Sequence, residues 1–274
     1  MARRLTGNVK KLARLFSSKR IPIEGIGFYN HPSFLQAERT DPSFLDQYAA
    51  WVRARPRDKK YDDHVRKTLP RIVDIVVHEL RDDTAMGACR DASMLLTKLF
   101  ELEGIWCYAA KGAVSIDAPS LGTSTNFWLF DTVENAAHVW VVAPPFEIID
   151  ITLRQQHYSH GERELLPEFV LLESAETFTP VLSDFCSLEL RGQLQQYEPP
   201  QSIVDAYTKT MECADFFPSY RVKFGTALVS YAVGGITVSE APSIYEITNR
   251  RWNGRLAGEL YDNIVRPKLS GVGR

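Results

Sequence analysis

Three residues of this sequence, Cys89, His138 and Asp150, are of types that together can perform acyl-transfer chemistry. A cysteine attacks a carbonyl carbon as its thiolate. A histidine can take the thiol proton and later give it to the leaving group, and a carboxylate on the far ring nitrogen holds the imidazole in the required tautomer. We therefore predict that Cys89 is a nucleophile, that His138 is its general base and then acid, and that Asp150 orients His138.

Cys89 stands where a helix is expected to begin. The apolar residues that follow recur at helical spacing, and Gly104 is a typical C-terminal cap. These apolar residues are Leu95, Leu96, Leu99, Phe100 and Leu102. A helix N-terminus favours negative charge and so lowers the pKa of a thiol. The backbone N–H of Cys89 would also be one donor to the oxyanion of a tetrahedral intermediate.

His138 and Asp150 belong to two short runs with the composition of strands, 138–142 and 148–152. Pro144-Pro145-Phe146 lies between them and is typical of a hairpin connection. Two strands joined in this way pair antiparallel, and alternate side chains of both share one face. We therefore expect His138 and Asp150 to be neighbours across the hairpin.

The remaining elements must place this hairpin and the cysteine helix. We predict a helix from Pro70 to about Arg81, ended by Asp82-Asp83-Thr84. Further predictions are loops over 21–60 with a helix at 44–52, strands at 105–110 and 127–130, an apolar run at 227–233 and a terminal helix over 244–265.

The segments around the three residues resemble bacterial transglutaminase-like proteins. Gly87-Ala88-Cys89-Arg90-Asp91 before an apolar helix, then His138-Val139-Trp140, then Asp150-Ile151-Thr152 follow that family's order. The resemblance covers about residues 70–155. It implies an α+β fold with a papain-like core, in which the nucleophile helix packs on an antiparallel sheet and helical additions lie at the N- and C-terminal ends.

The resemblance also implies a function. It indicates a cysteine enzyme that cleaves or transfers an amide or isopeptide acyl group of a protein or peptide, most simply as a peptidase or amidase. It gives no reason to expect a cofactor or a metal. In animal members an aromatic side chain upstream of the cysteine serves the oxyanion, and here Trp51 or Tyr61 is a candidate for that part, with plain packing as the alternative.

Two other functions remain open at this point. The chain can be a non-catalytic binding module that keeps the fold, or a cysteine-dependent acyltransferase that uses thioester donors. Selective alkylation of Cys89 well below pH 8 distinguishes an activated site from a core cysteine.

Other residues of reactive type have plainer interpretations. Cys107 is expected to be a buried strand residue, and nothing in sequence singles out Cys186 or Cys213. His157 and His160 form an H-x-x-H pair that could hold zinc with a third ligand, but their polar surroundings favour a solvated loop. Arg90 and Asp91 either orient the loop at the cysteine or form an exposed charge pair.

We expect a basic amphipathic helix over residues 1–20 and one catalytic domain over 21–274. The helix has seven basic residues and no acid. They are Arg3, Arg4, Lys10, Lys11, Arg14, Lys19 and Arg20. The apolar stripe of Leu5, Val9, Leu12 and Phe16 could dock on its own domain; alternatively the helix binds an acidic partner or an anionic surface, or acts as a transit peptide.

Composition narrows the class of protein further. Basic and acidic residues number 32 and 34, so no global charge points to nucleic acid. No run is apolar enough for a membrane span, and the N-terminus lacks the apolar stretch of a secretory signal. The four scattered cysteines suggest neither a disulfide framework nor a zinc site, which favours reduced thiols and a cytoplasmic location.

Overall fold

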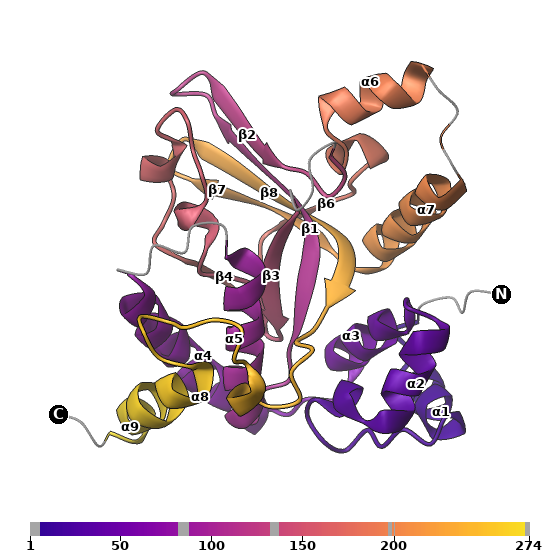
Figure 1. Cartoon of the computed structure of the whole chain (residues 1–274), viewed down its shortest axis with the longest axis vertical. Coiled ribbons are helices and arrows are strands. Elements are labelled where there is room, and N and C mark those ends of the chain that lie inside the picture. Colours follow the sequence, from indigo (N-terminus) through magenta and orange to yellow (C-terminus); the bar gives the residue numbers. More distant parts are fainter. Residues whose placement is uncertain (1–5, 82–87, 132–136, 197–198, 200, 272–274) are drawn as a thin grey trace.

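The structure, a computed structural model, describes residues 6–81, 88–131, 137–196, 199 and 201–271. Helices surround one curled antiparallel sheet, so the α+β class is confirmed (Figure 1). The α-helices are α1 (Val9–Ser18), α2 (Pro32–Thr40), α3 (Phe44–Ala54), α4 (Lys59–Leu80), α5 (Cys89–Leu102), α6 (Leu188–Gln196), α7 (Gln201–Phe216), α8 (Ala257–Leu260) and α9 (Arg266–Ser270).

Shorter helical turns and the strands complete the chain. The 3-10 helices are η1 (Phe28–Asn30), η2 (Leu153–Gln155), η3 (Glu162–Leu165), η4 (Leu182–Asp184) and η5 (Ile244–Glu246), and η6 (Tyr261–Val265) is π-helical. The strands are β1 (Tyr108–Ala118), β2 (Thr123–Phe127), β3 (His138–Ala143), β4 (Phe146–Asp150), β5 (Val170–Leu172), β6 (Glu176–Phe178), β7 (Ser219–Phe224) and β8 (Ala227–Thr237).

The sheet has the strand order β5-β4-β3-β1-β8-β7-β6, with β2 paired to β1. Strand β1 pairs with β3 along its first half, ending at Gly112 opposite His138, and with β2 along its second half, starting at Val114 opposite Phe127. Strand β1 thus changes partner from β3 to β2 along its length (Figure 1). The register places His138 at this fork.

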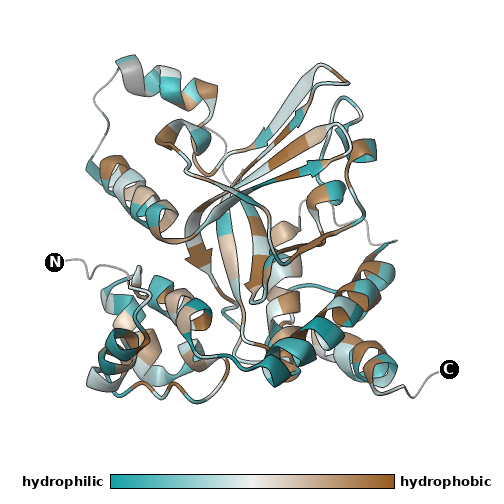
Figure 2. Ribbon diagram, turned by 180° about the vertical axis from the view of Figure 1, so that it is seen from behind, coloured by the Kyte–Doolittle hydropathy of each residue, from teal (hydrophilic) through white to brown (hydrophobic). Residues whose placement is uncertain are grey.

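Hydrophobic side chains form separate cores on the two faces of the sheet. Trp140 and Val142 of β3 pack with the N-terminal helices and β8, whereas Val141 of β3 and Ile149 of β4 pack with α4, α5 and α8. Figure 2 shows hydrophobic residues on the central strands and along one side of several helices, interspersed with hydrophilic residues. Alternation along β3 thus assigns its even-numbered side chains to one face and its odd-numbered ones to the other.

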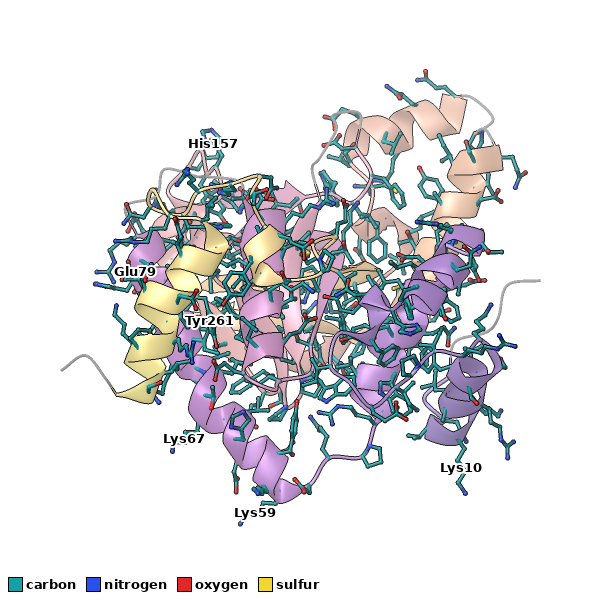
Figure 3. The ribbon with its side chains drawn as sticks, turned by 60° about the horizontal axis from the view of Figure 1, so that its bottom comes forward. Lys10, Lys59, Lys67, Glu79, His157 and Tyr261 are labelled. Carbon is teal, nitrogen blue, oxygen red and sulfur yellow. The ribbon has the colours of Figure 1, made fainter. Side chains whose placement is uncertain are left out.

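The apolar stripe of α1 docks on its own domain. Leu12 and Phe16 are fully buried, and the Phe16 ring lies 5.0 Å from that of Phe28. Lys10 points away from the body of the protein (Figure 3). The apolar face is therefore already covered, and only the basic face of α1 remains open to a partner; Leu5 and the predicted basic residues Arg3 and Arg4 lie outside the described residues.

The prediction that a helix begins at Pro70 is wrong. Helix α4 begins at Lys59, because the Asp58 side chain caps it by accepting a hydrogen bond from Tyr61 N at 2.7 Å. The buried positions Val65 and Leu69 extend the apolar stripe ahead of Pro70. Because this stripe is buried, its packing stabilises the helix enough to accommodate Pro70, which removes one backbone hydrogen bond. The predicted break at 82–84 lies outside the described residues.

Two other segment predictions need correction. The segment 21–60 holds not only the predicted helix, which runs as α3, but also α2, which Pro32 starts in its first turn. The predicted continuous helix over 244–265 is wrong: a turn with positive φ at Asn253 and Gly254 separates η5 from α8. The predicted strand 105–110 begins later, as β1. The predicted strand 127–130 is wrong beyond its first residue, because β2 ends at Phe127 and Phe130 instead forms an isolated bridge to Cys186.

In the described part of the chain, no helix combines the length and hydropathy that crossing a bilayer requires.

Gly112 is required by the close packing at the fork. A Cβ at this position would lie 1.9 Å from the Ala232 carbonyl oxygen and 3.1 Å from the Trp140 ring. We predict that Gly112→Ala lowers the free energy of unfolding by about 3 kcal/mol, because backbone or ring must move. Chemical denaturation measures this. Gly235→Ala in β8, where no atom lies within 4 Å of the added Cβ, is the matched control; equal effects of both substitutions would contradict the packing argument.

Candidate active site

Cys89 is the first residue of α5, as predicted. Ala88 is the N-cap residue and provides no side-chain cap, so the N–H groups of the first turn are not satisfied by a capping side chain. The positive end of the helix macrodipole therefore acts directly on the thiol. Gly104 has φ +76° and ends the helix. Gly87 of the sequence motif lies outside the described residues.

The Cys89 side chain is buried against the beginning of β3. It packs with Met94, Ala109 and Val139, and 8% of the residue remains exposed. In its protonated form Sγ donates a long hydrogen bond to the Ala137 carbonyl at 3.9 Å. The thiol thus lies beside the backbone immediately before and after His138.

His138 and Asp150 are in direct contact across the β3–β4 hairpin. His138 Nε2 lies 2.7 Å from Asp150 Oδ2, and each residue is 1% exposed. The other carboxylate oxygen, Oδ1, accepts hydrogen bonds from Thr152 N at 2.9 Å, Thr152 Oγ1 at 3.1 Å and Leu153 N at 3.0 Å. Because these donors fix the carboxylate, Asp150 holds the imidazole in one orientation.

Burial and pairing shift the pKa values of His138 and Asp150 in opposite directions. Burial opposes ionisation of Asp150, but His138 and the Thr152 donors outweigh it and lower the pKa of the carboxyl. Burial likewise disfavours the imidazolium, but the charge and hydrogen bond of Asp150 raise the pKa of His138. The pair therefore favours a carboxylate and an imidazolium.

The other ring nitrogen of His138, Nδ1, is buried and has no hydrogen-bond partner of ordinary geometry among the described residues. The Cys89 thiol is nonetheless close enough to interact. Burial raises the pKa of Cys89, but the hydrogen-bonding and charge interactions with His138, with a contribution from the Val139 N–H, lower it overall. Nδ1 is thus the nitrogen left to exchange a proton with the thiol.

Aromatic rings hold the imidazole at the fork of the sheet. The His138 ring is stacked on Trp140 with centroids 6.4 Å apart, and Phe127 of β2 lies 5.9 Å away. Cys89 approaches β3 from the α5 side, with Val139, whereas His138 shares a face with Trp140. Thiol and imidazole therefore meet at the first residue of β3 rather than across the middle of one face.

Sequence reasoning missed Tyr231. Its hydroxyl donates to Asp150 Oδ2 at 3.1 Å from β8, on the far side of β1, and its ring lies 5.1 Å from Trp140. The apolar run at 227–233 indicated a strand there. Only the strand order could have shown that Tyr231 faces Asp150 across the sheet.

We predict that Tyr231→Phe lowers the free energy of unfolding by about 2 kcal/mol near neutral pH, since a buried carboxylate loses a donor. Because the folded-state pKa of Asp150 is lowered, the contribution of the carboxylate is present above its ordinary pKa of 3.8 and is lost as pH falls through the folded value. The difference in free energy of unfolding between wild type and Tyr231→Phe should therefore shrink as the pH falls through that value. Denaturation curves across pH measure it; a difference that stays constant in acid would contradict the assignment.

The structure gives the other singled-out residues packing roles. Trp51 packs edge-to-face on Phe16 with ring centroids 6.2 Å apart, and the Tyr61 hydroxyl accepts a hydrogen bond from Trp106 N at 2.9 Å. Neither has a described contact with Cys89. Among the described residues, which include His157 and His160, no group of three or more His, Cys, Asp or Glu side chains is placed to hold a metal ion.

The remaining thiols differ from Cys89 in their surroundings. Burial raises the pKa of Cys107, Cys186 and Cys213, whose exposure is 1%, 1% and 2%. None of the four cysteines forms a disulfide. Cys89 is thus the thiol of this set that ionises most readily.

Arg90 and Asp91 attach the first turn of α5 to the segment after β8. Arg90 forms an ion pair with Glu240 at 2.7 Å and Asp91 one with Arg250 at 3.2 Å. The Arg90–Glu240 pair is exposed and the Asp91–Arg250 pair is partly exposed, so both contribute little stability. They link the loop over 239–250 to the helix start.

Comparisons of the chain with protein-family models, with curated proteins and with solved structures found no match.

Proposed function

We propose that this protein is a transglutaminase-like cysteine hydrolase that acts on an amide or isopeptide bond of a protein or peptide. One observation carries the proposal: His138 is held by Asp150 through Nε2 at 2.7 Å while Nδ1 is left for the Cys89 thiol at a helix N-terminus. A buried histidine with a purely structural role would be expected to use both nitrogens.

In the proposed reaction the thiol proton passes to His138 Nδ1, and the Cys89 thiolate adds to the substrate carbonyl carbon. The tetrahedral intermediate collapses as the imidazolium protonates the leaving nitrogen, which leaves a thioester on Cys89. Water, deprotonated by His138, then hydrolyses the thioester to release the acid. Asp150 keeps its charge throughout and stabilises the imidazolium.

The oxyanion needs donors that do not move during the reaction. The backbone N–H of Cys89, at the uncapped start of α5, provides one such donor. The packing of Trp51 and the hydrogen bond accepted by Tyr61 give no support to a side-chain donor from either residue. We therefore assign the oxyanion to the helix N-terminus.

An acylation experiment tests the proposal. Purified protein is mixed with p-nitrophenyl acetate, p-nitrophenol release is followed, and the intact protein and its peptides are weighed by mass spectrometry. We expect a burst of p-nitrophenol and one acetyl group on Cys89, which is absent in Cys89→Ala. Acetylation that does not map to Cys89, or that persists in Cys89→Ala, would overturn the proposal.

The same adduct distinguishes hydrolysis from transfer. Decay of the acetyl-enzyme in buffer at a rate unchanged by added methylamine supports a hydrolase. Decay that accelerates with amine concentration, with acetylated amine as product, would show a transferase instead.

A further inference from the structure

A pocket of about 240 Å³ opens over the part of the sheet where β1 pairs with β2 and β8. Its residues on β1 lie beyond Ala109, the residue of this strand against which Cys89 packs. Ser115, which lines the pocket, is roughly 20 Å from Ala109 along the strand. A buried cluster that includes Ala113 and Phe185 covers the sheet between them. The pocket is therefore separate from the candidate active site.

A row of polar side chains forms the floor of this pocket. Ser115 of β1 is the register partner of Asn126 in β2 and of Ser230 in β8. Ser230 is in turn opposite Arg221 of β7. Directly opposite residues of neighbouring strands point to the same face of a sheet, and all four residues line the pocket. Four adjacent strands therefore present one continuous polar row.

The protein itself leaves most of this row without partners. In the described part of the chain, the side chains of Ser115, Asn126 and Ser230 form no hydrogen bond with another residue. Each of the three is half-buried. A hydroxyl and a side-chain amide can both donate and accept hydrogen bonds. The row thus offers donors and acceptors at the fixed spacing of the strands.

Charged groups of both signs border the row. Asp117 Oδ1 accepts a hydrogen bond from Ser124 Oγ at 2.7 Å, and Asp184 Oδ2 accepts one from a backbone N–H at 2.8 Å. The second oxygen of each carboxylate accepts none from the residues that the structure describes. The guanidinium carbon of Arg221 lies 4.4 Å from the centroid of the Phe178 ring, and Arg221 forms no ion pair with a described carboxylate.

Aromatic and apolar side chains complete the walls. Trp128, Phe178 and Leu228 line the pocket beside the polar row. Arg191 of α6 lies over the Trp128 ring, 5.8 Å from its centroid. The volume of about 240 Å³ is below the roughly 300 to 1,000 Å³ of sites that hold drug-sized molecules. A single ring with its substituents therefore fits.

The chemistry of the lining disfavours simpler ligands. Asp117 and Asp184 repel an anion, and Arg221 repels a cation. A wholly apolar molecule displaces water from the polar row without replacing its hydrogen bonds. A neutral ring with several hydroxyl groups meets every condition, because hydroxyls donate to carboxylates and accept from a guanidinium, while the C–H face of the ring packs on an aromatic wall.

We propose that this pocket binds one neutral sugar ring, with its hydroxyl groups over the polar row and its C–H face on Trp128. Ser115, at the centre of the row by register, supplies a hydrogen bond to one hydroxyl. Binding of the sugar does not involve Cys89. It therefore goes beyond the proposed function, and either can fail without the other.

Saturation-transfer NMR on the full-length protein tests the proposal. The probes are the methyl glycosides of glucose, galactose and mannose, together with methyl glucuronide, cyclohexanol and adenosine. We expect transfer to at least one neutral glycoside, and weaker binding of methyl glucuronide than of the best neutral glycoside because Asp117 and Asp184 repel its carboxylate. Absence of transfer to every neutral glycoside, or a preference for the glucuronide, cyclohexanol or adenosine, would overturn the proposal.

Variants locate the bound sugar. Ser115→Ala should weaken binding of the best glycoside about fivefold, as for the loss of one hydrogen bond, and Trp128→Ala should abolish detectable binding. Ser17→Ala, which changes an exposed serine on α1, should have no effect. Circular dichroism establishes that each variant is folded. Affinity that is unchanged in folded Ser115→Ala, or that falls equally in Ser17→Ala, would refute the site.

Discussion

Replacement of His138 by glutamine is expected to slow acetylation of Cys89 by p-nitrophenyl acetate by about 10²- to 10⁴-fold at neutral pH, the usual contribution of a positioned acid–base group. The reason lies in the opposing influences on the thiol. Burial raises the pKa of Cys89, and the interactions with His138 lower it. Without the imidazole, burial dominates, and the thiolate becomes scarce.

The control for this variant must separate chemistry from folding. His138→Gln leaves Asp150 buried with no cationic partner, although the donors from Thr152, Leu153 and Tyr231 remain. The double variant with Asp150→Asn removes that charge and should restore stability without restoring acetylation. A single variant that folds and is acetylated at the wild-type rate would contradict the assignment of His138.

Asp150→Asn is the second large effect we expect, with acetylation slowed by about 10²- to 10⁴-fold although the shape of the side chain is kept. An amide can present its N–H₂ group to Nε2 and so favour the wrong imidazole tautomer. Burial lowers the pKa of His138, and Asp150 is the main group that offsets it. We therefore expect the pKa of His138 to fall in this variant, which NMR titration of the ring protons measures.

The difference in stability between wild type and Asp150→Asn should depend on pH in a defined direction. The raised pKa of His138 contributes stability that is fully present below its ordinary value of 6.5 and is lost as pH rises through the folded value. The lowered pKa of Asp150 contributes stability above 3.8 that is lost as pH falls. Wild type should therefore exceed Asp150→Asn most between these values. A difference that is largest in alkali would contradict the pairing.

Local patterns in the sequence were sufficient to predict the elements that carry the three residues. Helical spacing and Gly104 predicted α5 with Cys89 at its start, and Pro144-Pro145 predicted the hairpin that joins β3 to β4. These signals are local because a helix start and a short turn are each specified within a few residues. The prediction that His138 and Asp150 are neighbours follows from the hairpin alone.

Features that depend on distant segments were not predicted. Tyr231 reaches Asp150 across β1, and its position follows from a strand order that no short pattern encodes. Helix α4 was placed too late because Pro70 is a stronger local signal than the cap at Asp58. The sequence predicts a helix over the loop that contains Trp252, because its apolar residues have helical spacing. The turn at Gly254 interrupts that helix.

The most direct test of the central claim is the pH dependence of Cys89 alkylation by iodoacetamide, followed by mass spectrometry from about pH 5 to about pH 10 in wild type and His138→Gln. We predict an inflection below the ordinary thiol pKa of 9.0 in wild type, with the other cysteines unlabelled until unfolding. In His138→Gln the inflection should move above that value. Wild-type labelling that begins only near pH 9, or that is unchanged in His138→Gln, would show that the imidazole does not activate the thiol.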